Sequence, residues 1–161
     1  EVCLMAVAAA KLAALHGLPS ASWMCTDAMT PDAQAAAETM MAALAHSAGG
    51  VGLIWGVGQI ESQKTLSPVK AVIDDEIVGM ARRFARGSEH TMNHFQGEFY
   101  EPKLLCRVSR EQWDAAGRRD LADRARERAV SILAADRPPL LDEAATGELR
   151  RIEQAYLSQL D

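Results

Sequence analysis

Hydrophobic positions along the chain follow two patterns, unbroken apolar runs and apolar residues at helical spacing. Residues 51–57 form an unbroken apolar run, which is typical of a parallel strand covered on both faces. A shorter, mostly apolar run at 21–25 predicts a second strand. Helical spacing predicts helices at 2–16, 31–47, 68–86, after Ser109, after Asp120 and over about 142–160. Alternating strands and helices of this kind indicate an α/β fold with a parallel sheet.

Polar residues set the expected helix limits. Thr30-Pro31 and Ser67-Pro68 each place a capping side chain before a proline, which suits the first helical position. Ser109 and Asp120 can cap the later helices. We expect residues 74–76, an acidic run in the middle helix, to form its exposed face.

The run at 51–57 becomes polar just beyond its carboxyl end. In α/β folds ligands bind at the carboxyl ends of strands, so we expect Trp55, Gln59 and Glu61 at or near a site. Asp27 follows the run at 21–25 in the same way. The alternative is that Trp55 belongs to the core and Glu61 is a solvated loop residue.

Composition excludes several classes of protein. The 161 residues carry a net charge of -5 without a basic stripe, which disfavours nucleic-acid binding. No apolar run reaches the roughly 20 residues of a membrane helix. The three cysteines are odd in number and widely spaced, so no disulfide framework is expected and a cytoplasmic location fits best. Because Glu1 is no initiator and a helix begins at once, we expect a fragment or a processed piece.

One histidine pair suggests metal chemistry. His90 and His94 are four residues apart, a spacing that can place both imidazoles on one helix face, with Cys106 as a candidate third ligand. A structural or substrate-shaping role is the alternative. The sequence contains no phosphate loop, dinucleotide fingerprint, nucleophile elbow or zinc-spaced cysteine pair.

Several short motifs occur in a characteristic order over almost the whole chain. They are Thr26-Asp27, Asp32-x-Gln34-x-x-x-Glu38, Gly58-x-Ile60-Glu61-Ser62, Ser67-Pro68, Val72-Ile73-Asp74-Asp75-Glu76-Ile77, His90-Thr91, Phe99, Pro102, Arg107 and Trp113-x-x-x-Gly117. Together they resemble the C-terminal part of the trimethylamine methyltransferase (MttB) family, which includes glycine betaine methyltransferases.

The resemblance implies a TIM barrel of which this chain supplies only part. Residues 1–108 would contain the last barrel strands and residues 109–161 a C-terminal helical extension. Family members have roughly thirty more residues where Gly87-Ser88 joins two motifs here. We therefore expect a segment near 87–88 to be either deleted or missing from the sequence as given, which puts one barrel strand in doubt. A barrel without its other strands has open edges, and we expect the fragment alone to be inactive.

The resemblance also implies the chemistry. A methyl group would pass from a trimethylammonium compound to the cobalt of a corrinoid carried by a partner protein, with no cofactor or metal bound by this chain itself. Trp55 could offer an aromatic face to the cation, and Glu61 or Asp27 a negative charge. Gln59 and His90 complete the expected substrate-binding residues. No side-chain nucleophile is needed, because cobalt(I) is itself the nucleophile; homo-oligomerisation is left open.

Two other functions remain open from the sequence. The chain could be a catalytically inactive, truncated paralogue that acts as an interaction subunit, which the short join at 87–88 favours. It could also be a metal-dependent TIM-barrel enzyme that uses His90, His94 and Cys106.

Overall fold

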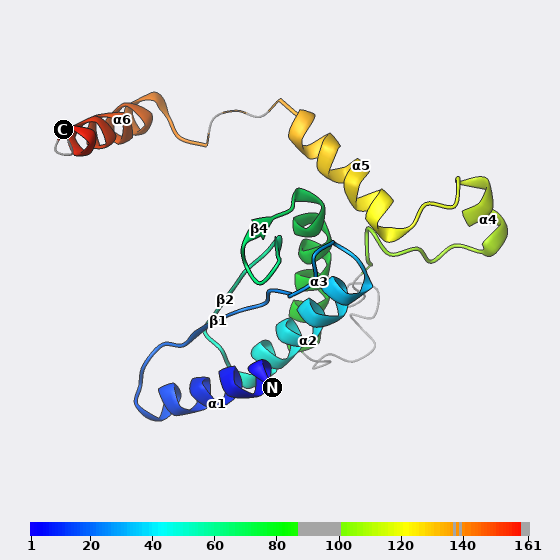
Figure 1. The fold of residues 1–161 in the computed structure, drawn as a ribbon, viewed down its shortest axis with the longest axis horizontal. Helices are drawn as coiled ribbons and strands as arrows, with labels where there is room; N and C mark the ends of the chain where they lie inside the picture. Colours follow the sequence, from blue (N-terminus) through cyan, green and yellow to red (C-terminus); the bar gives the residue numbers. More distant parts are fainter. Residues whose placement is uncertain (87–100, 137, 139, 159–161) are drawn as a thin grey trace, which may run out of the picture.

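The structure is a computed structural model that describes residues 1–86, 101–136, 138 and 140–158. Helices predominate, and two small sheets lie among them (Figure 1). In chain order the elements are α1 (Val2–Leu15), β1 (Ala21–Trp23), α2 (Ala33–Gly49), β2 (Leu53–Trp55), β3 (Gln59–Ile60), β4 (Thr65–Leu66), α3 (Pro68–Arg86), α4 (Arg110–Ala115), α5 (Leu121–Ala134) and α6 (Glu143–Leu157).

Each sheet contains two strands. β1 and β2 pair in parallel with Trp23 opposite Trp55, which confirms the parallel pairing expected from the alternation of strands and helices. β3 and β4 form an antiparallel hairpin directly after β2, with Gln59 opposite Leu66. The sequence pattern did not predict this hairpin, because its strands have only two residues each.

Only one face of the parallel pair is covered within the described residues. Ile54 packs against the core that α2 and α3 form, whereas Leu53 and Trp55 on the opposite face are 56% and 55% exposed. The expectation of a strand covered on both faces is therefore wrong for this structure. Among the residues that the structure describes, the apolar run packs against the core of α2 and α3 on one side, and no layer covers its other side.

Side chains cap several helices, and the caps at Ser109 and Asp120 confirm the predictions from the sequence. Asp142, Ser109 and Asp120 cap α6, α4 and α5, the last two through complete capping boxes. The α2 cap is Asp32, whose carboxylate accepts the backbone N–H groups of Gln34 at 2.9 Å and Ala35 at 3.2 Å. A cap at Thr30 with Pro31 as first helical residue was the wrong prediction, since a carboxylate is the stronger acceptor at the positive helix end.

The core forms where α2, α3 and α5 meet beneath β1. It consists of small and aliphatic side chains, namely Met24, Ala42, Ala43, Ile73, Ile77, Ala81, Leu104 and Ala125. α1 packs on the end of α2, where a side chain at Gly49 would lie 2.5 Å from Val7. None of the helices within the described ranges is long and apolar enough to cross a membrane.

Candidate functional site

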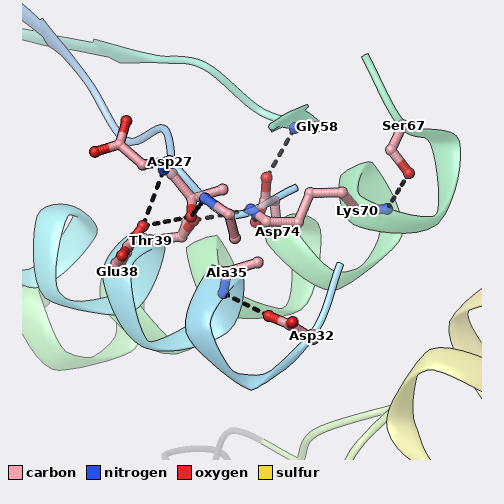
Figure 2. Close-up of polar contacts among 11 residues, drawn as sticks. Asp27, Asp32, Ala35, Glu38, Thr39, Gly58, Ser67, Lys70 and Asp74 are labelled. Carbon is pink, nitrogen blue, oxygen red and sulfur yellow. Dashed lines mark hydrogen bonds and ion pairs between the residues drawn. The ribbon is translucent and has the colours of Figure 1, made fainter. Parts of the chain in front are cut away.

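The segment after β1 is held by a single carboxylate of α2. The buried Thr26 hydroxyl donates to Glu38 Oε2 at 2.5 Å. The Asp27 N–H donates to the same oxygen at 3.0 Å (Figure 2). Gln34 donates its amide to the other oxygen at 2.9 Å. These hydrogen bonds, that of Thr26 foremost, hold the pKa of the Glu38 carboxyl below its usual value. An ionised Glu38 therefore fixes the polar end of β1 to the helix.

The segment after β1 also binds the turn that follows β3. The N–H groups of Glu61 and Ser62 donate to the carbonyls of Ala28 and Thr26 at 3.0 and 3.1 Å. The Ser62 hydroxyl donates to Asp27 Oδ1 at 2.6 Å. Two of the residues expected at the site, Asp27 and Glu61, therefore lie on segments that are joined directly to one another.

The turn itself has an uncommon backbone. Glu61, Ser62 and Gln63 have φ values of 54°, 52° and 75°, three consecutive left-handed residues that are not glycine. Such a conformation persists only where other contacts hold it. Here Glu61 accepts the Thr65 hydroxyl at 3.0 Å, and Gln63 donates to the sulfur of Cys25 at 3.6 Å.

A buried ion pair holds the neighbouring loop between β2 and β3. The Lys70 ammonium donates to Asp74 and, at 2.8 Å, to the Thr39 hydroxyl, while the other oxygen of Asp74 accepts the Gly58 N–H at 2.7 Å (Figure 2). Lys70 and Asp74 are both 0% exposed. Burial raises the pKa of the Asp74 carboxyl, whereas Lys70 and Gly58 act in the opposite direction.

This pair corrects the expectation of an exposed acidic face at 74–76. Asp74 and Glu76 are buried, and only Asp75 is exposed. The overlooked signal was the spacing of four residues from Lys70 to Asp74, one turn apart on the side of the helix that also buries Ile77.

Two tryptophans lie side by side at the carboxyl ends of the parallel strands. Trp23 and Trp55 are register partners, and they are 40% and 55% exposed on the face turned away from α2 and α3. Two indoles next to one another can contact an apolar or cationic group together. Trp55 was expected from the sequence as a possible site residue; Trp23 was missed because the run at 21–25 is so short.

The remaining expected residues have different outcomes. Gln59 begins β3 and places its side-chain oxygen close to Gly56, beside the end of β2. His90 and His94 lie outside the described residues, and Cys106 is exposed. Within the described part of the chain, no three histidine, cysteine or carboxylate groups are placed to hold a metal ion. Substrate contact by Asp27 and Glu61 stays a prediction.

Comparison with known proteins shows to which family this chain belongs. The family model described as trimethylamine methyltransferase (MTTB) matches residues 1–89 and 86–155. The chain belongs to this family. Trimethylamine methyltransferase MttB of Desulfitobacterium hafniense (strain DSM 10664 / DCB-2) is 30% identical over 94% of this chain and 36% of its own length. The MttB of Methanosarcina barkeri (strain Fusaro / DSM 804) is 34% identical over 83% of this chain and 32% of its own.

A third relative widens the range of substrates named in the family. A glycine betaine methyltransferase of Desulfitobacterium hafniense (strain Y51) is 30% identical over 99% of this chain and 38% of its own length. The chain thus spans about a third of the length of the curated relatives it matches.

The comparisons bear on the segment expected to be missing near 87–88. The alignment with the glycine betaine methyltransferase extends over 185 residues, although the chain has 161. That relative therefore has residues without a counterpart here. The family model is matched in two pieces that overlap only at residues 86–89. Both observations agree with a missing segment, which stays a prediction.

Replacing Glu38 by glutamine tests how the end of β1 is held. A carboxyl whose pKa is lower in the folded state stabilises the fold above its unfolded pKa, and this contribution is lost as pH falls through the folded value. We expect Glu38→Gln to lower the free energy of unfolding at pH 7 and to flatten its pH dependence below about pH 4.5. Urea unfolding at pH 7 and pH 3.5 measures both effects.

The matched control is Glu148→Gln, because Glu148 is an exposed carboxylate on α6 that pairs only with Arg151 in the described residues. The free energy of unfolding of the Glu148→Gln variant should differ from that of the unchanged chain by less than about 0.5 kcal/mol. An equal pH dependence in the Glu38→Gln variant and the unchanged chain would contradict the proposed role of Glu38.

Proposed function

We propose that this chain forms the C-terminal portion of a methyltransferase that removes a methyl group from a trimethylammonium compound and passes it to a corrinoid protein. The membership of the chain in the trimethylamine methyltransferase family supports the reaction class. The names of its relatives, trimethylamine and glycine betaine methyltransferases, support the choice of methyl donor. The acceptor and the partner protein are part of the proposal.

The observation that carries the proposal is the pair Trp23 and Trp55. In a TIM barrel the helices cover the outer face of the strands and the other face points inward. The two indoles lie on the face away from the helices, at the carboxyl ends of their strands, where barrel enzymes bind substrates. In the proposed partial barrel they would line the interior.

The residues suit a cation without hydrogen-bond donors. A trimethylammonium group is attracted to aromatic faces, with an energy of about 0.5–2 kcal/mol. Asp27 lies in the segment after β1 and Glu61 in the turn after β3. Both would supply negative charge near the positive nitrogen. The nucleophile in this proposal is the cobalt(I) of the partner's corrinoid, so the chain needs only to bind and orient the donor.

The first experiment is to read the coding sequence on both sides of residues 1–161. The proposal expects it to encode the other barrel strands. The longer protein is then assayed for methylation of cob(I)alamin by trimethylamine and glycine betaine. Absence of methyl transfer from both donors, with an intact upstream half, would count against the proposal.

Substitution of Trp55 tests the binding site in that longer protein. We expect Trp55→Ala to raise the KM for the trimethylammonium donor by about 2- to 30-fold, the equivalent of one lost cation–π contact, and Trp55→Phe to retain most of the affinity. Trp113→Ala is the matched control, since Trp113 lies on α4 and donates to the Arg119 carbonyl. An unchanged KM in Trp55→Ala would remove Trp55 from the site.

The second candidate is an inactive interaction subunit. It is favoured by the two-stranded parallel sheet, which has no further strand within the described residues. If the flanking sequence encodes no barrel strands, this candidate replaces the first. The metal-dependent alternative depends on His90 and His94, which lie outside the described residues.

A further inference from the structure

The exposed carboxylate of Asp27 is held in one direction. The Asp27 N–H donates to Glu38 Oε2 at 3.0 Å, which fixes the backbone of this residue (Figure 2). The Ser62 hydroxyl donates to Oδ1 of Asp27 at 2.6 Å, which fixes the side chain. No donor in the described part of the chain reaches the other oxygen, Oδ2. Asp27 therefore presents one oriented carboxylate oxygen to a ligand.

The Asp27 side chain lies on the same side of its segment as the indole of Trp23. From residue 22 to residue 28 every second residue is buried, and Trp23, Cys25 and Asp27 are more exposed than these. Such alternation places side chains on one face. Burial raises the pKa of the Cys25 thiol, and the negative charge of Asp27 acts in the same direction, which places the carboxylate near the thiol. The Cα atoms of Trp23 and Asp27 are at most about 14 Å apart, so a cation at the indole feels the carboxylate.

An uncommon backbone conformation presents the Ser62 hydroxyl to Asp27. Ser62 has φ 52° and lies between Glu61 and Gln63, which are also left-handed. Glycine adopts this conformation without strain, so the shape of the turn alone does not call for a serine. Strained residues of this kind cluster at ligand sites. What serine adds to the turn is the hydroxyl that holds the Asp27 carboxylate.

We propose that Ser62 is the positioning residue of the cation site: its hydroxyl holds Oδ1 of Asp27, so that Oδ2 faces a methylated cation beside Trp23 and Trp55. The inference rests on the proposed function, because that cation is the trimethylammonium group of the methyl donor. The indoles contact the methyl groups of the cation, whereas the oriented carboxylate responds to its charge. The site therefore selects for positive charge as well as for shape.

Binding of two probes to the full-length protein that contains this chain tests the role of Ser62. Choline and 3,3-dimethylbutan-1-ol have the same shape, and only choline carries a positive charge. We expect Ser62→Ala to raise the dissociation constant of choline by about 3- to 10-fold, the effect of one lost hydrogen bond, and that of the neutral alcohol by less than about 2-fold. A merely structural role would weaken the binding of both probes. Ligand-observed NMR titration measures both constants.

A rescue variant and a distant control make the test specific. Ser62→Asn should recover most of the choline affinity, because asparagine tolerates a positive φ and supplies an amide donor for Asp27. Ser158→Ala removes an exposed hydroxyl that donates to the Ala155 carbonyl at the end of α6. It should leave both dissociation constants within about 2-fold. Circular dichroism of each variant confirms that its helices are folded.

Two results would overturn the inference. One is a full-length protein that binds choline no more tightly than the neutral alcohol, because no oriented charge would then act at the site. The other is a Ser62→Ala variant that binds choline as before or loses affinity for both probes equally.

An assay of methyl transfer to cob(I)alamin separates this inference from the proposed function. If Ser62→Ala loses choline affinity alone and the unchanged protein transfers no methyl group, the proposed reaction fails and the role of Ser62 in cation binding stands. If the unchanged protein transfers methyl groups and Ser62→Ala binds choline as before, only the inference about Ser62 fails.

Discussion

Replacing Asp74 by alanine should lower the free energy of unfolding by about 3–5 kcal/mol, because it leaves the Lys70 ammonium buried without its carboxylate. The Gly58 N–H loses its acceptor in the same step. The loop after β2 is therefore expected to loosen together with the core. Urea unfolding followed by circular dichroism measures the loss.

Two further variants make this expectation specific. Asp75→Ala removes the neighbouring exposed carboxylate and should change the free energy of unfolding by less than about 0.5 kcal/mol. The double variant Lys70→Met with Asp74→Leu removes both charges and should recover most of the stability lost in Asp74→Ala. Equal losses in the single and double variants would show that the charges are not the cause.

Replacing Gly58 by alanine should cost about 3 kcal/mol of unfolding free energy, from backbone strain and overpacking together. Gly58 has φ +82°, and an added Cβ would lie 3.0 Å from both Ala71 and Leu66. Because the Gly58 N–H also binds Asp74, any shift of the backbone weakens that hydrogen bond. Thermal unfolding of the variant and the unchanged chain measures the difference.

Gly117→Ala separates the two contributions. Gly117 has a similar φ of +86°, but no atom lies within 4 Å of an added Cβ. Its replacement should therefore show only the conformational cost, about 1 kcal/mol. If Gly58→Ala and Gly117→Ala cost the same, the close packing around Gly58 contributes nothing.

The sequence predicts the helices and their caps better than it predicts the larger fold to which they belong. Ser109 and Asp120 cap their helices as expected, because a cap depends on residues only three positions apart. The parallel pairing of β1 and β2 also follows from local order along the chain. Whether the chain is part of a TIM barrel depends on strands beyond these residues and stays an expectation.

The contacts of the candidate site were harder to predict from the sequence, because they join segments that are far apart along the chain. Glu38 holds Thr26 from twelve positions away, and Asp74 holds Gly58 from sixteen. No local pattern distinguishes a carboxylate that makes such a contact from a solvated one. The exposure of Trp55 could not be predicted either, because an apolar run does not show which face of the strand packs against other residues.

The outer edges of β1 and β2 also affect how the chain behaves in isolation. Each strand bonds to the other along one edge, and the described residues place no strand along the opposite edges. Unsatisfied N–H and C=O groups on such edges invite strand addition by other chains, and ultimately aggregation. A short β-strand peptide that pairs with one of these edges should therefore bind there and improve solubility, much as donor strands complete sheets in other proteins.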